Sequence, residues 1–282
     1  MRRTGWYRVM VRRYEAVASV LLAGGWAARW AHDAGLQGRL VTTEHDIVLT
    51  DTRALPEPLR VGFASDLHAG RMTEPRLLEA AIARLVAGRP HVVVLGGDFV
   101  SLHQRDVEPL CRLLELLRPP LGVFAVLGNH DIHRDAAHVT AALSGIGVRV
   151  LRNSCAALPA PFGGVTIAGL DDPVLGEPDA AATFTPITGV RITAMHSPEG
   201  FHLLRGVDHA VVLTGHTHGG QVRLPGGTAL LLPPGCRRWK SGTFAVAGVA
   251  GGIIVSRGVG CSGVPLRVAC DPEVHLCVIR AE

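Results

Sequence analysis

The chain has 282 residues, of which 48% are hydrophobic and 18% are charged. This composition is that of a large globular domain, and it excludes a disordered chain and a long coiled coil. Aromatic residues make up only 5%, and no helix-length cluster of arginines accompanies the formal net charge of +4, so we expect no nucleic-acid partner. The six cysteines contain no Cys-x-x-Cys pair, and we interpret most of them as small buried residues.

Residues 1–54 form an N-terminal segment that we distinguish from a domain over residues 55–282. Arginines are frequent in residues 1–13, and an apolar run over residues 16–28 follows that is too short to span a bilayer. Three interpretations fit: a signal peptide or degenerate twin-arginine signal, a helix on the membrane surface, and a helix packed on the domain. Residues 1–40 are thus a candidate for peripheral membrane contact. The protein is then expected to be membrane-associated or cytoplasmic, with export as an alternative.

From residue 59 onward, short apolar runs alternate with helical stretches, which is typical of α/β proteins. Helices are predicted at residues 74–86 and 107–117, where prolines follow the apolar spacing. Strands are predicted at residues 60–65, 91–95, 121–127, 165–170, 190–195 and 210–213. Glycine-rich turns and further strands are expected over residues 219–279.

Acidic and histidine side chains follow five of these strands. They are Asp66 with His68, Asp98, Asn129 with His130 and Asp131, His196, and His216 with His218. Because ligand sites in open α/β sheets lie beyond the carboxyl ends of strands, we expect these side chains to converge. Imidazoles and carboxylates together favour a divalent metal site. Each motif alone also fits a turn, and Asp131 fits a cap of the following helix.

In this order the motifs D-x-H, G-D, G-N-H-D, H and G-H-x-H resemble those of the calcineurin-like metallophosphoesterases, over about residues 59–280. More narrowly, GHTHGGQ at residues 215–221, with residues 256–260 and Pro265, resembles a bacterial branch of membrane-associated or exported phosphodiesterases. Some members of that branch hydrolyse the pyrophosphate of UDP-2,3-diacylglucosamine. The resemblance implies a four-layer α/β/β/α sandwich with two divalent metal ions, manganese, iron or zinc, at one edge.

The resemblance also implies a role for each residue. The first metal ion would be held by Asp66, His68 and His218, the second by Asn129, His196 and His216, and Asp98 would bridge the two. His130 would act as general acid or bind phosphate, with Asp131 as its orienting partner. Four positive charges on two ions would exceed the two negative charges of Asp66 and Asp98, so the site would attract an anionic phosphate ester.

These roles imply hydrolysis of a phosphodiester or pyrophosphate bond by in-line attack of metal-bound hydroxide, on a small-molecule or lipid substrate. One alternative is a phosphomonoesterase, including a protein phosphatase. Another is a non-catalytic scaffold of the same fold, which the intact motifs disfavour. Arg237, Arg238 and Lys240 either bind a substrate phosphate or lie in a solvated loop. Neither the natural substrate nor the oligomeric state follows from the sequence.

Overall fold

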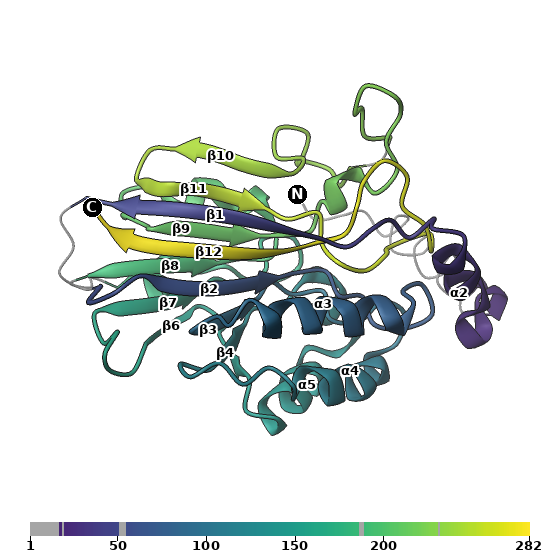
Figure 1. Ribbon diagram of the computed structural model, residues 1–282, viewed down its shortest axis with the longest axis horizontal. Coiled ribbons are helices and arrows are strands. Elements are labelled where there is room, and N and C mark those ends of the chain that lie inside the picture. The colour runs from purple at the N-terminus through teal and green to yellow at the C-terminus, as the bar shows by residue number, and fades with distance from the viewer. Residues whose placement is uncertain (1–16, 19, 51–54, 186–188, 231) are drawn as a thin grey trace.

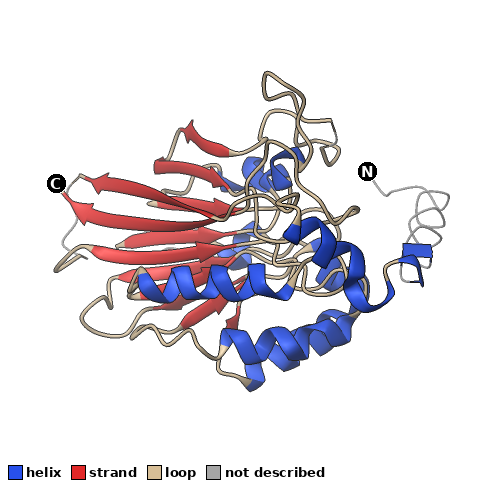
Figure 2. Cartoon of the chain, turned by 45° about the vertical axis from the view of Figure 1, so that its right-hand side comes forward, coloured by secondary structure: helices blue, strands red, loops and turns tan. Residues whose placement is uncertain are grey.

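The computed structural model describes residues 17–18, 20–50, 55–185, 189–230 and 232–282. Two six-stranded sheets lie face to face, and the long helices cover the outer face of one of them (Figures 1 and 2). The α/β sandwich that the sequence predicts is therefore present, and each of the six predicted strands is found with small shifts at its ends.

The first sheet carries the three long helices on its outer face. Its order is β1 (Val41–Leu49), β12 (Glu273–Ala281), β2 (Leu59–Ala64), β3 (Val92–Leu95), β4 (Val123–Ala125) and β5 (Arg149–Val150). Strands β2 to β5 run parallel, whereas β12 runs antiparallel to β2. The covering helices are α3 (Pro75–Ala87), α4 (Val107–Leu114) and α5 (Asn129–Gly145). In α3, a proline in the first turn fixes the start, and Leu78, Ile82 and Leu85 repeat at helical spacing on the buried face.

The second sheet has a much thinner outer layer. Its order is β10 (Gly242–Val246), β11 (Val249–Val255), β9 (Val211–Thr214), β8 (Val190–Ala194), β7 (Val165–Gly169) and β6 (Ser154–Ala157). Outside it lie the short helix α6 (Ala180–Thr183) and a 3-10 helix (Pro198–Leu204). The buried side chains of Phe184, Leu204 and Trp239 pack there against the sheet. The fourth layer of the sandwich thus consists of short elements.

The main core lies between the two sheets. Phe63 and Val94 from the first sheet pack in one cluster with Ile167, Ile192 and Ile254 from the second, and all five are fully buried. Parallel strands covered on both faces need apolar residues in succession, which explains the short apolar runs in the sequence. Five of the six cysteines are buried, as the sequence led us to expect, and all six are free thiols.

A strand that the sequence analysis did not anticipate lies within the N-terminal segment. Strand β1 pairs in parallel with β12 along its whole length, from Val41 opposite Glu273 to Leu49 opposite Ala281. Before it come a 3-10 helix (Ala23–Gly25) and α2 (Trp26–Asp33). The arginine-rich residues 1–13 lie outside the described residues, and the domain boundary at residue 54 stays a prediction. None of the described helices combines the length and the apolar character that a membrane span requires.

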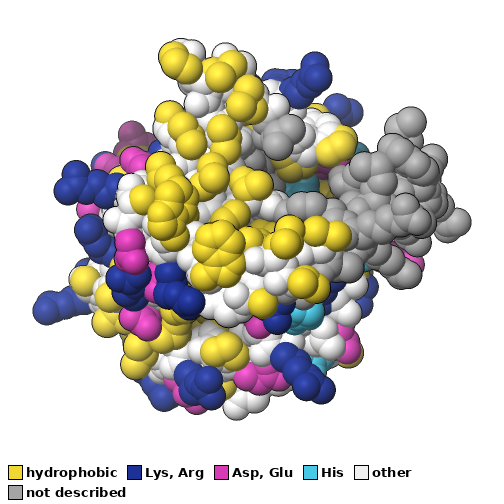
Figure 3. All heavy atoms as spheres, turned by 90° about the vertical axis from the view of Figure 1, so that its right-hand side faces the viewer, with side chains coloured by type: hydrophobic (Ala, Val, Ile, Leu, Met, Phe, Trp, Pro, Cys, Tyr) yellow, Lys and Arg dark blue, Asp and Glu magenta, His cyan; other side chains and the backbone are white. Residues whose placement is uncertain are grey.

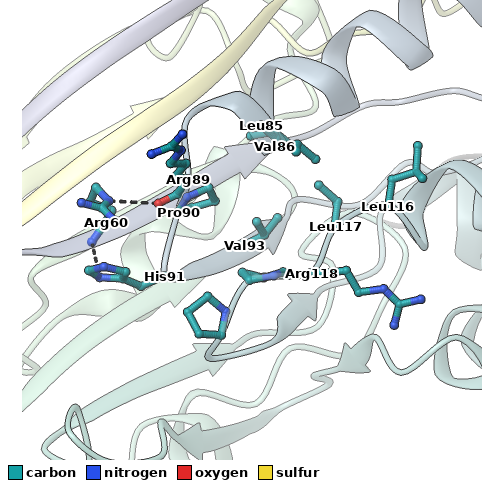
Figure 4. Close-up of a pocket in the computed structure, with 12 residues that line it drawn as sticks. Arg60, Leu85, Val86, Arg89, Pro90, His91, Val93, Leu116, Leu117 and Arg118 are labelled. Atoms are coloured by element: carbon teal, nitrogen blue, oxygen red, sulfur yellow. Dashed lines mark hydrogen bonds between the residues drawn. The ribbon is translucent and has the colours of Figure 1, made fainter.

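The topology brings the carboxyl ends of five strands to one edge of the molecule. Strands β2, β3 and β4 of the first sheet and β8 and β9 of the second end toward the right-hand side of Figure 1, where loops gather. At the other end of β2 to β4, Arg60, Arg89, His91 and Arg118 line a separate hollow of about 320 Å³ (Figure 4). That hollow holds none of the predicted site residues.

Candidate metal centre

All of the predicted site residues lie at the edge where these five strands end. Asp66 and His68 follow β2, Asp98 follows β3, Asn129 to Asp131 begin α5 after β4, His196 follows β8, and His216 and His218 follow β9. Within each of three groups the ligand atoms lie within 4.8 Å of one another: Asp66, His68 and His218; His68, Asp98 and His130; Asp98, His196 and His216. The structure thus shows the convergence, and the role of each residue as a ligand stays a proposal.

Asp98 occupies the centre of the cluster. Its Oδ2 lies 3.4 Å from His68 Nε2 and 3.2 Å from His196 Nε2. Its other oxygen, Oδ1, accepts a hydrogen bond of 2.8 Å from the backbone N–H of His130. One carboxylate oxygen therefore faces imidazoles that come from the two different sheets, which is the position that a shared ligand of two ions requires.

The orientation of His196 tests whether a cation fits at this point. His196 Nδ1 lies 2.8 Å from the backbone carbonyl of Gly96, and since a carbonyl only accepts, Nδ1 carries the ring proton. Nε2 then faces the Asp98 carboxylate, and the lone pair of a neutral ring would repel it at this distance. A positive charge therefore lies between the two atoms, either a proton on Nε2 in the metal-free protein or a bound cation. The buried Asn129 Oδ1 also has no hydrogen-bond partner among the described residues. A divalent cation satisfies both observations.

The ionisation of the cluster is compatible with metal binding. Burial raises the pKa of Asp66 to about 6 and lowers the pKa of His68 to about 3, so at neutral pH the carboxyl is charged and the imidazole is neutral. Although burial disfavours the charged imidazole, the Asp98 carboxylate raises the pKa of His196 well above its usual range. These are the conditions under which a cation replaces protons on its ligands.

The backbone at the site is in an uncommon conformation. Asp66, His68, Asp98, His216 and His218 all have positive φ angles, between 43° and 69°. Left-handed backbone costs a residue with a Cβ atom about 1–2 kcal/mol, and such strain concentrates at functional sites. Gly215 precedes His216 because a Cβ there would meet the carboxylate of Asp66. The turn brings the His216 N–H to 3.0 and 3.1 Å from the two Asp66 oxygens.

His130 and Asp131 differ in their surroundings. His130 is half-buried, its ring packs edge-on against His68, and its Nδ1 lies 3.4 Å from the carbonyl of Ser101. Asp131 is fully buried and accepts hydrogen bonds from the backbone N–H groups of Gly128, Phe99 and Val100 at 2.9, 2.8 and 3.2 Å. The orienting contact to His130 thus comes from the Ser101 carbonyl. Asp131 instead caps α5, the alternative that the sequence left open, and joins that helix to the loop after β3.

A pocket of about 350 Å³ opens beside the cluster. Its polar wall includes Asp98, Asn129, His130, His216 and His218. Its other wall is formed by Leu232, Pro233, Pro234 and Val264, residues that carry no recognisable motif. The cluster of acidic and histidine side chains could thus be located from the sequence, whereas the apolar wall of the neighbouring pocket could not.

Two further polar residues hold the loops around the pocket. Gln221 Nε2 donates to the carbonyls of Ser262 and Val264, and its Oε1 accepts from the N–H of Ser262. Arg267 is only 3% exposed, donates to the carbonyl of Gly260, and has a guanidinium nitrogen 3.4 Å from His218 Nδ1. Sequence reasoning missed Arg267, because one arginine among apolar residues does not reveal which loops it joins.

Comparisons with known proteins agree with this geometry. A model of the calcineurin-like phosphoesterase family matches residues 59–220, which is more than half of the chain. The chain is 28% identical to the uncharacterized metallophosphoesterase YkuE of Bacillus subtilis, an alignment that covers 94% of this chain and 93% of that protein. It is 30% identical to the phosphodiesterase YaeI of Escherichia coli, over 78% of this chain and 81% of that protein. An uncharacterized metallophosphoesterase of Aquifex aeolicus is also 30% identical, over 82% and 90%.

The contacts of Asp131 predict a role in stability. Changing Asp131 to Ala leaves three buried N–H groups without their acceptor, so we expect the free energy of unfolding to fall by about 3–5 kcal/mol. The measurement is denaturant unfolding in the presence of a chelator, so that loss of metal does not contribute. Asp135→Ala is the matched control, because the exposed Asp135 accepts a hydrogen bond from His138 N–H on the same helix and holds no buried N–H group among the described residues. Equal stability of the two variants would contradict this role.

The ionisation of the ligands predicts weaker metal binding in acid. In the metal-free protein Asp66 is protonated below about pH 6, and a cation must then displace that proton. Between pH 7 and pH 5 we therefore expect the affinity of chelator-stripped protein for Mn²⁺ to fall at least about tenfold. Calorimetric titration at both pH values measures it, and an unchanged affinity would show that Asp66 is not a ligand.

Proposed function

The chain belongs to the calcineurin-like phosphoesterase family and is a metal-dependent phosphoric ester hydrolase, and we propose that it cleaves phosphodiester or pyrophosphate bonds. The motif resemblance identified from the sequence is thereby confirmed. The phosphodiesterase YaeI, at 30% identity, supports the diester assignment. The charge and shape of the site support the finer proposal.

The position of Asp98 carries the proposal. Its Oδ2 lies between His68 Nε2 and His196 Nε2, and each of these imidazoles has further candidate ligands beside it. We assign one ion to Asp66, His68 and His218 and a second to Asn129, His196 and His216, with Asp98 shared. Two divalent ions, when bound, would activate a water molecule and stabilise the charge that develops on the phosphoryl oxygens.

The protein supplies orientation and charge around those ions. The Gly96 carbonyl fixes the tautomer of His196, and the two Asp66 oxygens accept the N–H of His216 and fix the start of the GHTH loop. With only Asp66 and Asp98 ionised in the ligand set, a positive potential remains that attracts an anionic ester. Because Asp66 and Asp98 are buried, water would screen the potential of the metal-loaded site less than it screens charges at the surface.

His130 is the residue that we assign to proton transfer. It lines the pocket and is half-buried, so it can exchange protons with solvent, unlike the fully buried His68 and His196. The Ser101 carbonyl near Nδ1 holds the proton on that nitrogen and leaves Nε2 for the substrate. From there the imidazolium would give its Nε2 proton to the leaving oxygen as the ester bond breaks.

The pocket favours a diester over a monoester. No Lys or Arg is among the described residues that line it, so a monoester dianion finds no side-chain cation there. Leu232, Pro233 and Val264 form instead an apolar wall that can receive the second ester substituent. The substrate we propose is therefore a phosphodiester or pyrophosphate with an organic group on each side.

This preference predicts the outcome of a paired assay. Metal-reconstituted enzyme should hydrolyse bis-p-nitrophenyl phosphate with a higher kcat/KM than p-nitrophenyl phosphate, because the monoester leaves the apolar wall empty. We expect a ratio of at least about tenfold, the selectivity that one apolar substituent provides. A higher kcat/KM for the monoester would instead establish the alternative, a phosphomonoesterase.

The assignment of His130 predicts a loss of turnover without a loss of metal. His130→Ala should lower kcat by about 10²–10⁴-fold, the usual contribution of a general acid, and leave both ions bound. His138→Ala is the matched control, since His138 lies on the same helix and pairs at the surface with Glu108. Wild-type turnover in His130→Ala, with metal content measured on the same sample, would exclude the role.

A further inference from the structure

Exposed apolar side chains gather on the face that contains the site. Of the thirteen large hydrophobic residues that are exposed in the described part of the chain, nine lie on residues 17–30 and 224–268, and the second of these segments contributes to the pocket wall. Figure 3 shows apolar side chains across this face. We call the nine the apolar face: Val17, Val20, Leu21, Trp26, Trp30, Leu224, Leu230, Val264 and Val268.

The loop over residues 224–236 is unusual for a surface segment, because it contains no charged residue. A bridge between Arg223 and Ala229 folds its first part into a narrow hairpin with Pro225 and two glycines at the tip. Leu224 and Leu230 on its two arms are 46% and 52% exposed. An exposed loop of this composition is unfavourable in water, so we expect it to contact an apolar environment.

Hydrogen bonds join the two segments into one surface. Arg267 N–H donates to the carbonyl of Leu36 just after α2, and Gln37 Nε2 donates to the carbonyl of Pro265. On the other side, Arg223 N–H donates to the carbonyl of Val268. The hairpin, residues 262–268 and the end of α2 are thus held side by side, and the apolar face does not depend on one loose element.

The apolar face continues into the catalytic pocket. Leu232 and Pro233, in the same uncharged loop, line the pocket together with Asp98 and His130, and so does Val264 of the apolar face. Whatever covers the apolar face therefore also lies at the entrance to the metal centre.

The charges around the loop indicate what covers it. Arg237, Arg238 and Lys240 are exposed directly after the uncharged residues, and residues 1–13, which precede the first segment, are rich in arginine. Trp26 and Trp30, 56% and 60% exposed, are residues that prefer the boundary between headgroups and acyl chains. Exposed cations directly after a loop with exposed leucines, on a face that also exposes tryptophan, fit an anionic lipid surface. A projecting hairpin also suits a fluid bilayer, which needs no complementary shape.

We propose that the apolar face docks the enzyme on an anionic phospholipid bilayer, with Leu224 and Leu230 inserted and the pocket entrance at the level of the headgroups. Docking would place the entrance of the metal centre against the bilayer, and this consequence for catalysis rests on the proposed function.

The test is binding of the full-length chain to vesicles of phosphatidylcholine with and without 30% phosphatidylglycerol. The wild type should co-sediment with the anionic vesicles, and Leu224→Ser/Leu230→Ser should bind at least about 30-fold more weakly, because two apolar side chains no longer leave water. Val86→Ser/Leu116→Ser is the matched control, since both are exposed apolar residues of the hollow in Figure 4, at the opposite end of the strands. It should bind as the wild type does.

Several outcomes would overturn the docking surface. One is wild-type binding no stronger than that of the hairpin variant. Another is light scattering that shows a dimer which the hairpin variant abolishes, because a second copy of the chain would then cover the face. Arg237→Gln/Lys240→Gln supplies a further readout: it should weaken binding to anionic vesicles at low salt and leave binding to neutral vesicles unchanged.

A kinetic arm separates this proposal from the proposed function. The hairpin variant should hydrolyse soluble bis-p-nitrophenyl phosphate at the wild-type rate, but a lipid-anchored phosphodiester in vesicles at least about tenfold more slowly. If the wild type cleaves neither diester, the proposed function fails while the vesicle measurement still decides the docking surface. Equal rates of the two proteins on the vesicle substrate would contradict the link between docking and catalysis.

Discussion

A single buried carboxylate links the two halves of this molecule at the site. Asp98 follows a strand of the first sheet, and its Oδ2 lies 3.4 Å from His68, which follows the same sheet, and 3.2 Å from His196, which follows the second sheet. Charges and lone pairs gathered in a buried place repel one another, and protons in the metal-free protein, or cations once bound, offset that repulsion. The hydrophobic core between the sheets, the Asp131 cap and the Gly96 carbonyl hold the groups in place before any ion binds.

The need to bring these side chains together also constrains the backbone. Several candidate ligands adopt positive φ angles at the ends of their strands, so the turns are shaped by where the side chains must point. Gly215 allows the closest of these approaches, between the GHTH loop and Asp66. Metal affinity in such a site therefore depends on the packing of both sheets, and substitutions far from the ions can weaken binding by shifting one sheet against the other.

Features that leave a local pattern in the sequence could be predicted, whereas features that arise from contacts between distant segments could not. Strands β2, β3, β7, β8 and β9 appear as buried apolar runs, and short motifs at their ends locate the site. Strand β1 could not be predicted because its polar residues, such as Glu44 and Asp46, are exposed at a sheet edge and leave no continuous apolar run. The role of Asp131 was ambiguous, since a carboxylate at the start of a helix can orient a histidine or cap the backbone. The apolar wall of the pocket, and with it the link to the apolar face, emerged only from contacts between distant segments.

The central claim is that two cations share Asp98, and anomalous diffraction tests it most directly. Crystals grown with Mn²⁺, with data collected on both sides of the manganese absorption edge, should show two peaks about 3.5–4 Å apart, each within ligand distance of an Asp98 oxygen. One peak should lie beside Asp66 and His218, the other beside Asn129 and His216. A single peak at full metal concentration, or two peaks without a common contact to Asp98, would contradict the account.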